Sequence, residues 1–214
     1  MAKALFVACR ACPDIKTTVA FLCTRVKDPD EDDWKKLIRL LKYLHATRDL
    51  CLTIEASNLK NPSWWADAAY AVHPDGKSHT GGVMSLGKAV VQTISKKQKI
   101  NTKSSTEAEL VGADDVMSDL LWSNNFLKAQ GYEPEKTVLL QDNTSAILLE
   151  KNGSESAGKR SKHIDNRYFF IKDCIKRMQV SVEHCPTDEM LADFFTKPMQ
   201  SAKFNKLRKQ LMNL

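Results

Sequence analysis

The 214-residue sequence predicts an α/β fold with a mixed five-stranded sheet flanked by helices and preceded by an α-helical hairpin. Three observations support this class. Residues 1–48 show only helical patterns. Residues 63–95 contain three closely spaced strand patterns, which are typical of an antiparallel meander. After residue 101 helical and strand patterns alternate, as expected where two further, parallel strands are joined by helices.

The hairpin is predicted from two helix starts. Pro13 and Asp14 are typical of the start of a helix that contains IKTTVAFLCTRV. A second helix is expected after KDPDEDD, because acidic residues are favourable in a first turn. A hairpin of this kind cannot bury its apolar face alone, so a partner surface is expected. The apolar positions of the second helix follow amphipathic spacing: Trp34, Leu37, Ile38, Leu41 and Leu44.

Strand patterns begin near residue 50. The alternating segment LCLTIEA (50–56) predicts one strand, and SWWADAAYA (63–71) follows Pro62 as the next. A polar, glycine-bearing turn separates it from GGVMSLG (81–87) and KAVVQTIS (88–95). We expect the last three of these segments to form the meander.

The remainder is expected to alternate between helices and strands. NTKSSTEAEL opens a long helix through Ala129 that ends at Gly131, and TVLLQD (137–142) has the apolar character of a buried parallel strand. The later predicted elements are a helix at 144–151, a loop at 152–161, a helix at 162–178, a strand at 179–185, a helix at 187–197 and a basic amphipathic helix at the end.

Composition limits the function classes. Hydrophobic residues make up 43% of the chain and charged residues 27%, which is ordinary for a soluble globular protein. We expect no membrane span, because no window of about 18 apolar residues exists, and no signal peptide, because the apolar opening is short and poorly flanked. The net charge of +6 is mild, and its clusters suit either a solvated surface or phosphate contacts. The clusters are Lys96, Lys97, Lys99 and Lys103; Lys159, Arg160 and Lys162; and Lys203, Lys206, Arg208 and Lys209.

Two aspartates are candidates for a site on the predicted sheet. Asp67 lies inside an apolar, aromatic strand, where a buried carboxylate needs a cation or several hydrogen bonds. The alternative is an exposed position on an edge strand. Asp142 ends a buried strand, at the edge where ligands bind in open α/β sheets. Alternatively, Asp142 or Asn143 caps the helix that follows.

Two further carboxylates lie on predicted helices. Ser104 with Glu107, and Thr106 with Glu109, both match the capping-box pattern, so one of the two glutamates is free for another role. Asp193 lies among apolar helix positions and is expected to border the core.

As a set, the four carboxylates predict a metal site. Adjacent strands can hold Asp67 and Asp142 side by side, and the flanking helices can bring Glu109 and Asp193 over the same edge. Clustered carboxylates repel one another unless a divalent cation neutralises them, and hard oxygen ligands favour Mg²⁺ or Mn²⁺. Two such ions about 4 Å apart can promote phosphodiester hydrolysis.

Five blocks of the sequence carry a family resemblance. In chain order they are WADAAYA, SSTEAEL, DNTSAI, SKHIDNRYFFIKD and PTDEMLADFFTKP. Together they resemble the ribonuclease H domain of copia-type LTR-retrotransposon Pol polyproteins. The segment ACPDIKTTVAFLCTRVKDPDEDDWKKLIRLLKYL is similar to the helical end of the reverse transcriptase that precedes this domain. The resemblance therefore implies two parts, 1–48 from the reverse transcriptase and 49–214 as the ribonuclease H domain.

The resemblance implies a ribonuclease H-like fold and an enzyme that cuts the RNA strand of RNA–DNA hybrids with two Mg²⁺ ions, for which Mn²⁺ can substitute. Asp67 would contact both ions, Glu109 and Asp142 one of them, and Asp193 the other. Lys96, Lys97, Lys103, Arg160 and Lys162 would bind nucleic acid. The partners implied are the hybrid and the polymerase part of the same polyprotein, and the location a cytoplasmic virus-like particle or the nucleus; the oligomeric state stays open.

The chain departs from the family pattern at Ala69 and Tyr70, where the family often has Asp and Trp. Many ribonucleases H carry a product-release histidine shortly before the last catalytic aspartate; here His184 is near but is equally compatible with a strand position facing the sheet interior. One alternative function is a non-catalytic connection module that grips template-primer. Another is a transposase or integrase of the same fold, which the order Asp, Glu, Asp, Asp disfavours.

Overall fold

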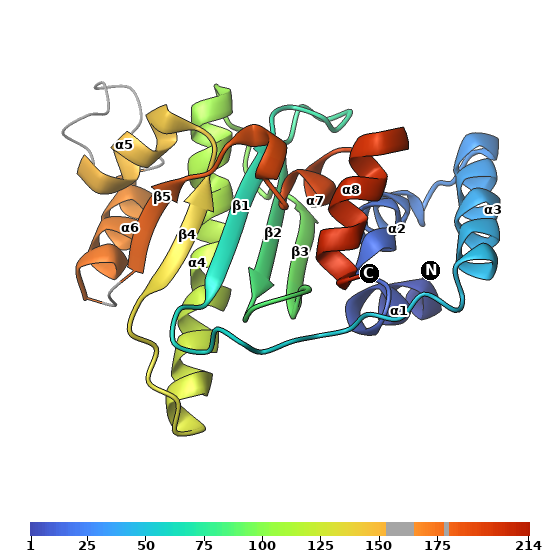
Figure 1. Ribbon diagram of the computed structural model, residues 1–214. Coiled ribbons are helices and arrows are strands. Elements are labelled where there is room, and N and C mark those ends of the chain that lie inside the picture. Colours follow the sequence, from blue (N-terminus) through green and yellow to red (C-terminus); the bar gives the residue numbers. More distant parts are fainter. Residues whose placement is uncertain (153–164, 178–179) are drawn as a thin grey trace.

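The computed structural model describes residues 1–152, 165–177 and 180–214, and its centre is a mixed five-stranded sheet (Figure 1). The strand order is β3-β2-β1-β4-β5. β1, β2 and β3 form the antiparallel meander, and β4 and β5 run parallel to β1, so the predicted fold class is confirmed. The strands are β1 Ser63–Ala69, β2 His79–Ser85, β3 Gln92–Lys97, β4 Thr137–Gln141 and β5 Val180–His184.

Helices cover both faces of this sheet. One face packs on α4, α5 and α6 through a core that includes Trp64 and Leu139. The other face packs on α7 and α8 through Val83, Phe195 and Leu207. The helices are α1 Ala2–Arg10, α2 Lys16–Arg25, α3 Glu31–Ala46, α4 Ser105–Ala129, α5 Thr144–Asn152, α6 Asp165–Arg177, α7 Asp193–Thr196 and α8 Ser201–Met212, with short 3-10 helices at Pro13–Ile15 and Thr187–Glu189.

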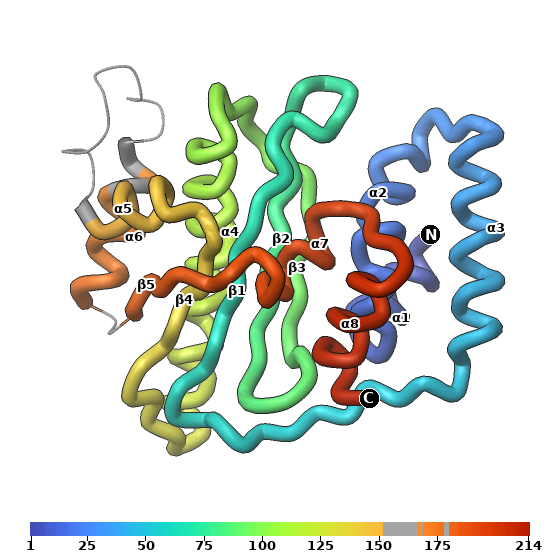
Figure 2. Tube along the Cα trace, turned by 45° about the horizontal axis from the view of Figure 1, so that its top comes forward, coloured from blue at the N-terminus to red at the C-terminus, as the bar shows by residue number. Residues whose placement is uncertain are grey.

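The N-terminal helices α1–α3 lie beyond α7 and α8, away from the sheet centre (Figure 2). They enclose a small core of their own around Ile15, Val19 and Leu40. Polar contacts join them to the rest: Thr17 Oγ1 donates to the carbonyl oxygen of Phe194 at 2.6 Å, and a partly buried network links α3 to α8. The predicted hairpin thus finds part of its partner surface within this chain.

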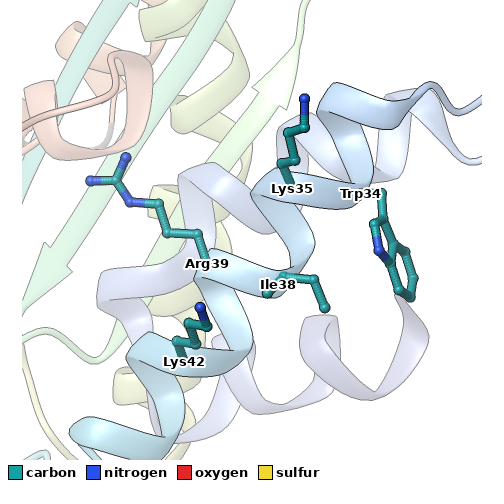
Figure 3. Close-up of a pocket in the computed structure, with 5 residues that line it drawn as sticks. All are labelled: Trp34, Lys35, Ile38, Arg39 and Lys42. Atoms are coloured by element: carbon teal, nitrogen blue, oxygen red, sulfur yellow. The ribbon is translucent and has the colours of Figure 1, made fainter.

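The outward face of α3 stays open to solvent. Trp34 and Leu41 are 62% and 50% exposed. Around Trp34 the surface forms a shallow hollow that three cationic side chains border (Figure 3). Among the described residues, no helix combines the length and apolar character needed to cross a membrane.

Two sequence-based expectations about local structure are wrong. LCLTIEA forms no strand; only an isolated bridge joins Glu55 to Lys88. Leu50 and Leu52 instead pack on the α7–α8 core, and alternation produced by packing on helices resembles alternation in a half-buried strand. The helix expected at 187–197 is broken, because Met190 has extended backbone (φ −70°, ψ 95°) and only a four-residue helix, α7, follows it.

Candidate metal centre

Asp67 and Asp142 lie at the same level on neighbouring parallel strands. The register pairs Trp65 of β1 with Leu140 of β4, and continuing it by two residues sets Asp67 beside Asp142. β1 is the central strand and Asp67 is only 2% exposed, so the edge-strand alternative is wrong. Asn143 Oδ1 accepts from the Ala146 amide and caps α5, which leaves the Asp142 carboxylate free of the capping role.

Glu107 and Glu109, the two candidate glutamates, have different roles at the start of α4. The Glu107 amide donates to Ser104 Oγ at 3.2 Å, and Glu107 Oε2 accepts from the Lys103 amide at 2.7 Å. Glu107 therefore stabilises the helix end. Glu109 is buried on the side of α4 that faces β1, where Gly112 lies beside Asp67 and Ala68.

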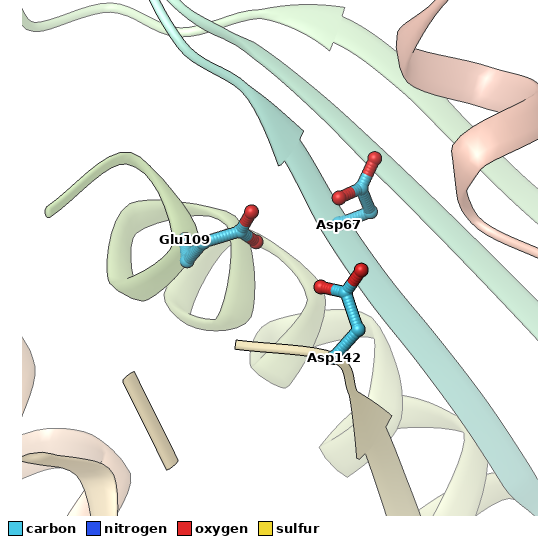
Figure 4. A group of neighbouring side chains, drawn as sticks. All are labelled: Asp67, Glu109 and Asp142. Atoms are coloured by element: carbon cyan, nitrogen blue, oxygen red, sulfur yellow. The ribbon is translucent and has the colours of Figure 1, made fainter. Parts of the chain in front are cut away.

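Asp67, Glu109 and Asp142 converge near the carboxyl ends of β1 and β4 (Figure 4). Each offers one carboxylate oxygen, and these oxygens all lie within 4.8 Å of one another. Burial, together with the charges of Asp67 and Asp142, raises the pKa of Glu109 to about 9. Burial likewise raises the pKa of Asp67 to about 6. Three carboxylates held this close repel one another unless a cation or protons intervene.

A divalent cation fits this group. Glu109 Oε2 is buried and has no hydrogen-bond partner among the described residues, so it has an unused acceptor directed into the cluster. All donors are carboxylate oxygens, which favour Mg²⁺ or Mn²⁺ over softer metals. Asp142 is half-buried rather than enclosed, and the cluster is therefore open on that side.

Asp193 does not join the three-carboxylate group. It is the first residue of α7 and is 2% exposed. Its Oδ1 accepts from Lys197 Nζ at 2.8 Å and its Oδ2 from Lys203 Nζ at 2.7 Å. Burial acts to raise the pKa of Asp193, but these two lysines more than offset it and the pKa lies below its ordinary value. Lys197 Nζ also lies 3.7 Å from Asp67 Oδ2, which accepts a hydrogen bond from Thr196.

Sequence reasoning missed Lys197 and Thr196. Lys197 follows Asp193 by four residues, a spacing that brings side chains together on a helix, and this was the available signal. No sequence signal pointed to Thr196. Gly81, which lies opposite Asp67 in the β1–β2 register, makes the arrangement possible: a Cβ there would lie 2.6 Å from the Ala192 carbonyl oxygen and from Thr196 Cγ2.

Comparison with known proteins gives a consistent result. The chain is 32% identical over 205 residues to the Retrovirus-related Pol polyprotein from transposon TNT 1-94 of Nicotiana tabacum, covering 94% of this chain and 15% of that protein. It is 31% identical over 201 residues to the Pol polyprotein from transposon RE2 of Arabidopsis thaliana, covering 93% of this chain and 14% of that protein. This chain is homologous to a segment of retrotransposon Pol polyproteins. It spans about 15% of the length of the first of these relatives.

This Pol segment was also compared with protein-family models and with solved structures. No protein-family model matches it. Among solved structures it is similar to the N-terminal RNase H domain of a Mycobacterium tuberculosis protein, with 15% identity and a TM-score of 0.47, covering 64% of this chain and 90% of that one.

The predicted nucleic-acid contacts of the Pol segment differ in their surroundings. Lys96 and Lys97 end β3 and pair with Asp115 at 3.2 Å and Asp75 at 2.8 Å. Lys103 is exposed just before α4. Arg160 and Lys162 lie outside the described residues.

His184 is exposed at the end of β5, beside Gln141, so the alternative in which it faces the sheet interior is wrong. It ends its strand at the same edge of the sheet as the carboxylates.

Proposed function

We propose that this chain is the ribonuclease H domain of a copia-type Pol polyprotein, joined to the helical end of its reverse transcriptase, and that it cuts the RNA strand of RNA–DNA hybrids. The observation that carries the proposal is the convergence of Asp67, Glu109 and Asp142 around an unused, buried carboxylate oxygen. The homology to Pol polyproteins supports the proposal, because the family resemblance of the sequence is to the ribonuclease H domain of polyproteins of this kind.

The three carboxylates would hold a divalent cation, which when bound supplies Lewis-acid activation for phosphodiester hydrolysis. The chain contributes rigidity: Asp67 is on the central strand and Glu109 is on the first turns of a 25-residue helix packed against it. Thr196 holds one oxygen of Asp67 and so fixes the direction of the other. Such preorganisation limits the rearrangement needed when substrate binds.

The cluster is open on the side of Asp142, directly after the end of β4, and an RNA–DNA hybrid would approach there. Lys103 is exposed next to the helix that carries Glu109 and is available to a phosphate. Lys96 is paired with Asp115 but remains 47% exposed, so it can exchange this partner for a phosphate. Contacts to the 2′-hydroxyl groups would distinguish RNA from DNA.

The test is cleavage of a labelled RNA–DNA hybrid by the purified chain, with Mg²⁺ or with EDTA. Glu109→Gln removes one charge from the carboxylate group and Glu107→Gln makes the same change two residues away, outside it. Loss of an outer-shell partner alone costs roughly 10–100-fold, so Glu109→Gln should cost about 100-fold or more. Glu107→Gln should retain activity. An inactive wild-type chain, or equal activity of the two variants, would refute the proposal.

A further inference from the structure

We infer that Lys197 holds the position of the second cation, so that a second divalent ion binds only when this lysine is displaced. The inference rests on the proposed function and concerns the same site. Lys197 Nζ lies between Asp193 Oδ1, at 2.8 Å, and Asp67 Oδ2, at 3.7 Å. A second ion shared by Asp67 and Asp193 would have to use these same carboxylates.

The oxygens on this side of the site are already engaged. Asp193 Oδ1 accepts from Lys197, and Asp193 Oδ2 accepts from Lys203 at 2.7 Å. Asp67 Oδ2 accepts from Thr196. In contrast, Glu109 Oε2 lacks any partner among the residues that the structure describes. The side chains as they stand therefore fit one ion at the three-carboxylate group and do not fit another at Asp193.

Charge explains why lysines lie there. Asp67 and Asp193 are each 2% exposed, and two buried carboxylates this close need positive charge or protons nearby. Lys197 and Lys203 supply that charge from within the chain. An ammonium and a divalent cation repel each other, so both cannot occupy the space between Asp67 and Asp193.

Displacement of Lys197 is sterically feasible. Its side chain is 50% exposed, so the ammonium can turn into solvent without unfolding α7. Asp193 would keep Lys203 as a partner while one oxygen becomes available to an ion. The first ion displaces no ammonium, since the hydrogen bond to Asp142 Oδ2 comes from the neutral Thr187 hydroxyl, at 3.1 Å. The second ion must therefore bind more weakly than the first, by the cost of breaking the lysine contacts.

The experiment measures Mn²⁺ binding to the full chain by calorimetry and by electron paramagnetic resonance. Lys197→Met removes the ammonium and keeps the length of the side chain. We expect the affinity for a second Mn²⁺, relative to the first, to rise about tenfold or more, because hydrogen bonds between charged groups are lost on binding only in the wild type. Lys197→Arg keeps the charge and should behave like the wild type.

Lys206→Met is the matched control for a general loss of positive charge. Lys206 is on α8 with Lys203, but it donates to the Asp188 carbonyl oxygen rather than to a carboxylate of the site. It should leave the ratio of the two affinities unchanged. An unchanged ratio in Lys197→Met, or a second site that is weaker or still absent there, overturns the inference.

A measurement on the wild type covers the case in which Lys197→Met does not fold. The rate of amine acetylation at Lys197 is followed by mass spectrometry during a Mn²⁺ titration, with Lys206 as the internal reference. We expect acetylation of Lys197 to accelerate at the Mn²⁺ concentrations that follow occupation of the first site. A constant rate throughout overturns the inference. Failure of the proposed function is distinct, since it appears as an absent first ion or absent hybrid cleavage.

Discussion

At the scale of single residues, the chain contains a buried carboxylate outside the proposed site. Glu150 of α5 is 0% exposed, and among the described residues its carboxylate oxygens have no well-formed hydrogen bond beyond an approach of the Gln141 side chain. Burial raises the pKa of Glu150 to about 8. An ionised group in this environment would be strongly destabilising, so Glu150 is held protonated in the folded chain at neutral pH.

Glu150 should make stability decline with rising pH. Its unfolded pKa is near 4.5 and its folded pKa is higher, so the folded state binds more protons between the two values. This contribution is complete below about pH 4.5 and is lost as the pH rises toward 8. Glu150→Gln should make the decline shallower, leaving the part that Glu109 and Asp67 contribute, and should stabilise the chain at pH 8 by roughly 1–3 kcal/mol. Urea unfolding from pH 5 to pH 8 measures this, and an equally steep decline in the variant would contradict it.

A second residue-scale feature joins α3 to α8. Tyr43 donates to Asp14 Oδ2, and Arg208 donates to the Tyr43 hydroxyl at 3.1 Å. Burial and the bond to Asp14 raise the pKa of Tyr43 to about 12, so the hydroxyl remains a donor at all ordinary pH values. The network is part of the surface through which the N-terminal helices dock.

Tyr43→Phe should lower the free energy of unfolding by about 1–3 kcal/mol, because the buried Asp14 carboxylate loses its donor. Hydrogen exchange should become faster in α2 and α3 first. Tyr132→Phe is the matched control, since Tyr132 is 48% exposed and its hydroxyl loss should be nearly neutral. Equal effects of the two changes on urea unfolding would argue against a structural role for the network.

At the scale of elements, the short helix α7 depends on one glycine of the sheet. A Cβ at Gly81 would lie 2.6 Å from the Ala192 carbonyl oxygen, a distance that real Cβ atoms essentially never reach. α7 carries Thr196, which donates a hydrogen bond to Asp67, and Asp193, which lies beside Asp67. The absence of one side chain on β2 therefore allows α7 to reach the site.

Gly81→Ala should displace α7 and cost about 1–3 kcal/mol of stability, as overpacking commonly does. Hybrid cleavage should fall further than the folded fraction does, because Thr196 would no longer hold Asp67. Gly112→Ala is the control on the other side of Asp67: the nearest contact of its Cβ is an ordinary 3.4 Å, and alanine favours the helix. Normal activity in Gly81→Ala would exclude a positioning role for α7.

At the scale of the whole molecule, the N-terminal helices and the sheet domain support one another. α2 contacts α7 through the hydrogen bond from Thr17 to Phe194. The N-terminal helices therefore help to hold α7, which carries Asp193, in place. Division of the chain at residue 48 into a reverse-transcriptase part and a ribonuclease H part remains a prediction. The packing shows that the two parts share an interface around α7 and α8.

Metal binding should stabilise the whole molecule. The three carboxylates repel one another unless a cation or protons intervene, and an ion that binds only the folded state adds about 2.7 kcal/mol at a hundredfold excess over its dissociation constant. Mg²⁺ should therefore raise the thermal midpoint of the wild type. The increase should vanish in Asp142→Asn. NaCl at matched ionic strength is the control, and an equal rise with NaCl would contradict a specific site.

The sequence by itself determined the strand order of the meander, the long helix α4, the buried parallel strands and the four candidate carboxylates, because apolar periodicity and unusual carboxylates in apolar segments are local signals. It left two choices open, between Glu107 and Glu109 and between Asp142 and Asn143 as helix cap. Tertiary structure brought Glu109 into the cluster and made Asn143 the cap.

Only the tertiary structure decided which side chains α7 brings to Asp67. Thr196 and Lys197 lie far from Asp67 along the chain, and their contacts with it arise when α7 packs on the sheet beside Gly81. The same packing broke the helix expected at 187–197, because Met190, Leu191, Phe194 and Phe195 are buried together where periodicity predicted one continuous helix. Periodicity reports which residues are buried, whereas the partner that buries them, and the charges that come to face one another, depend on the fold as a whole.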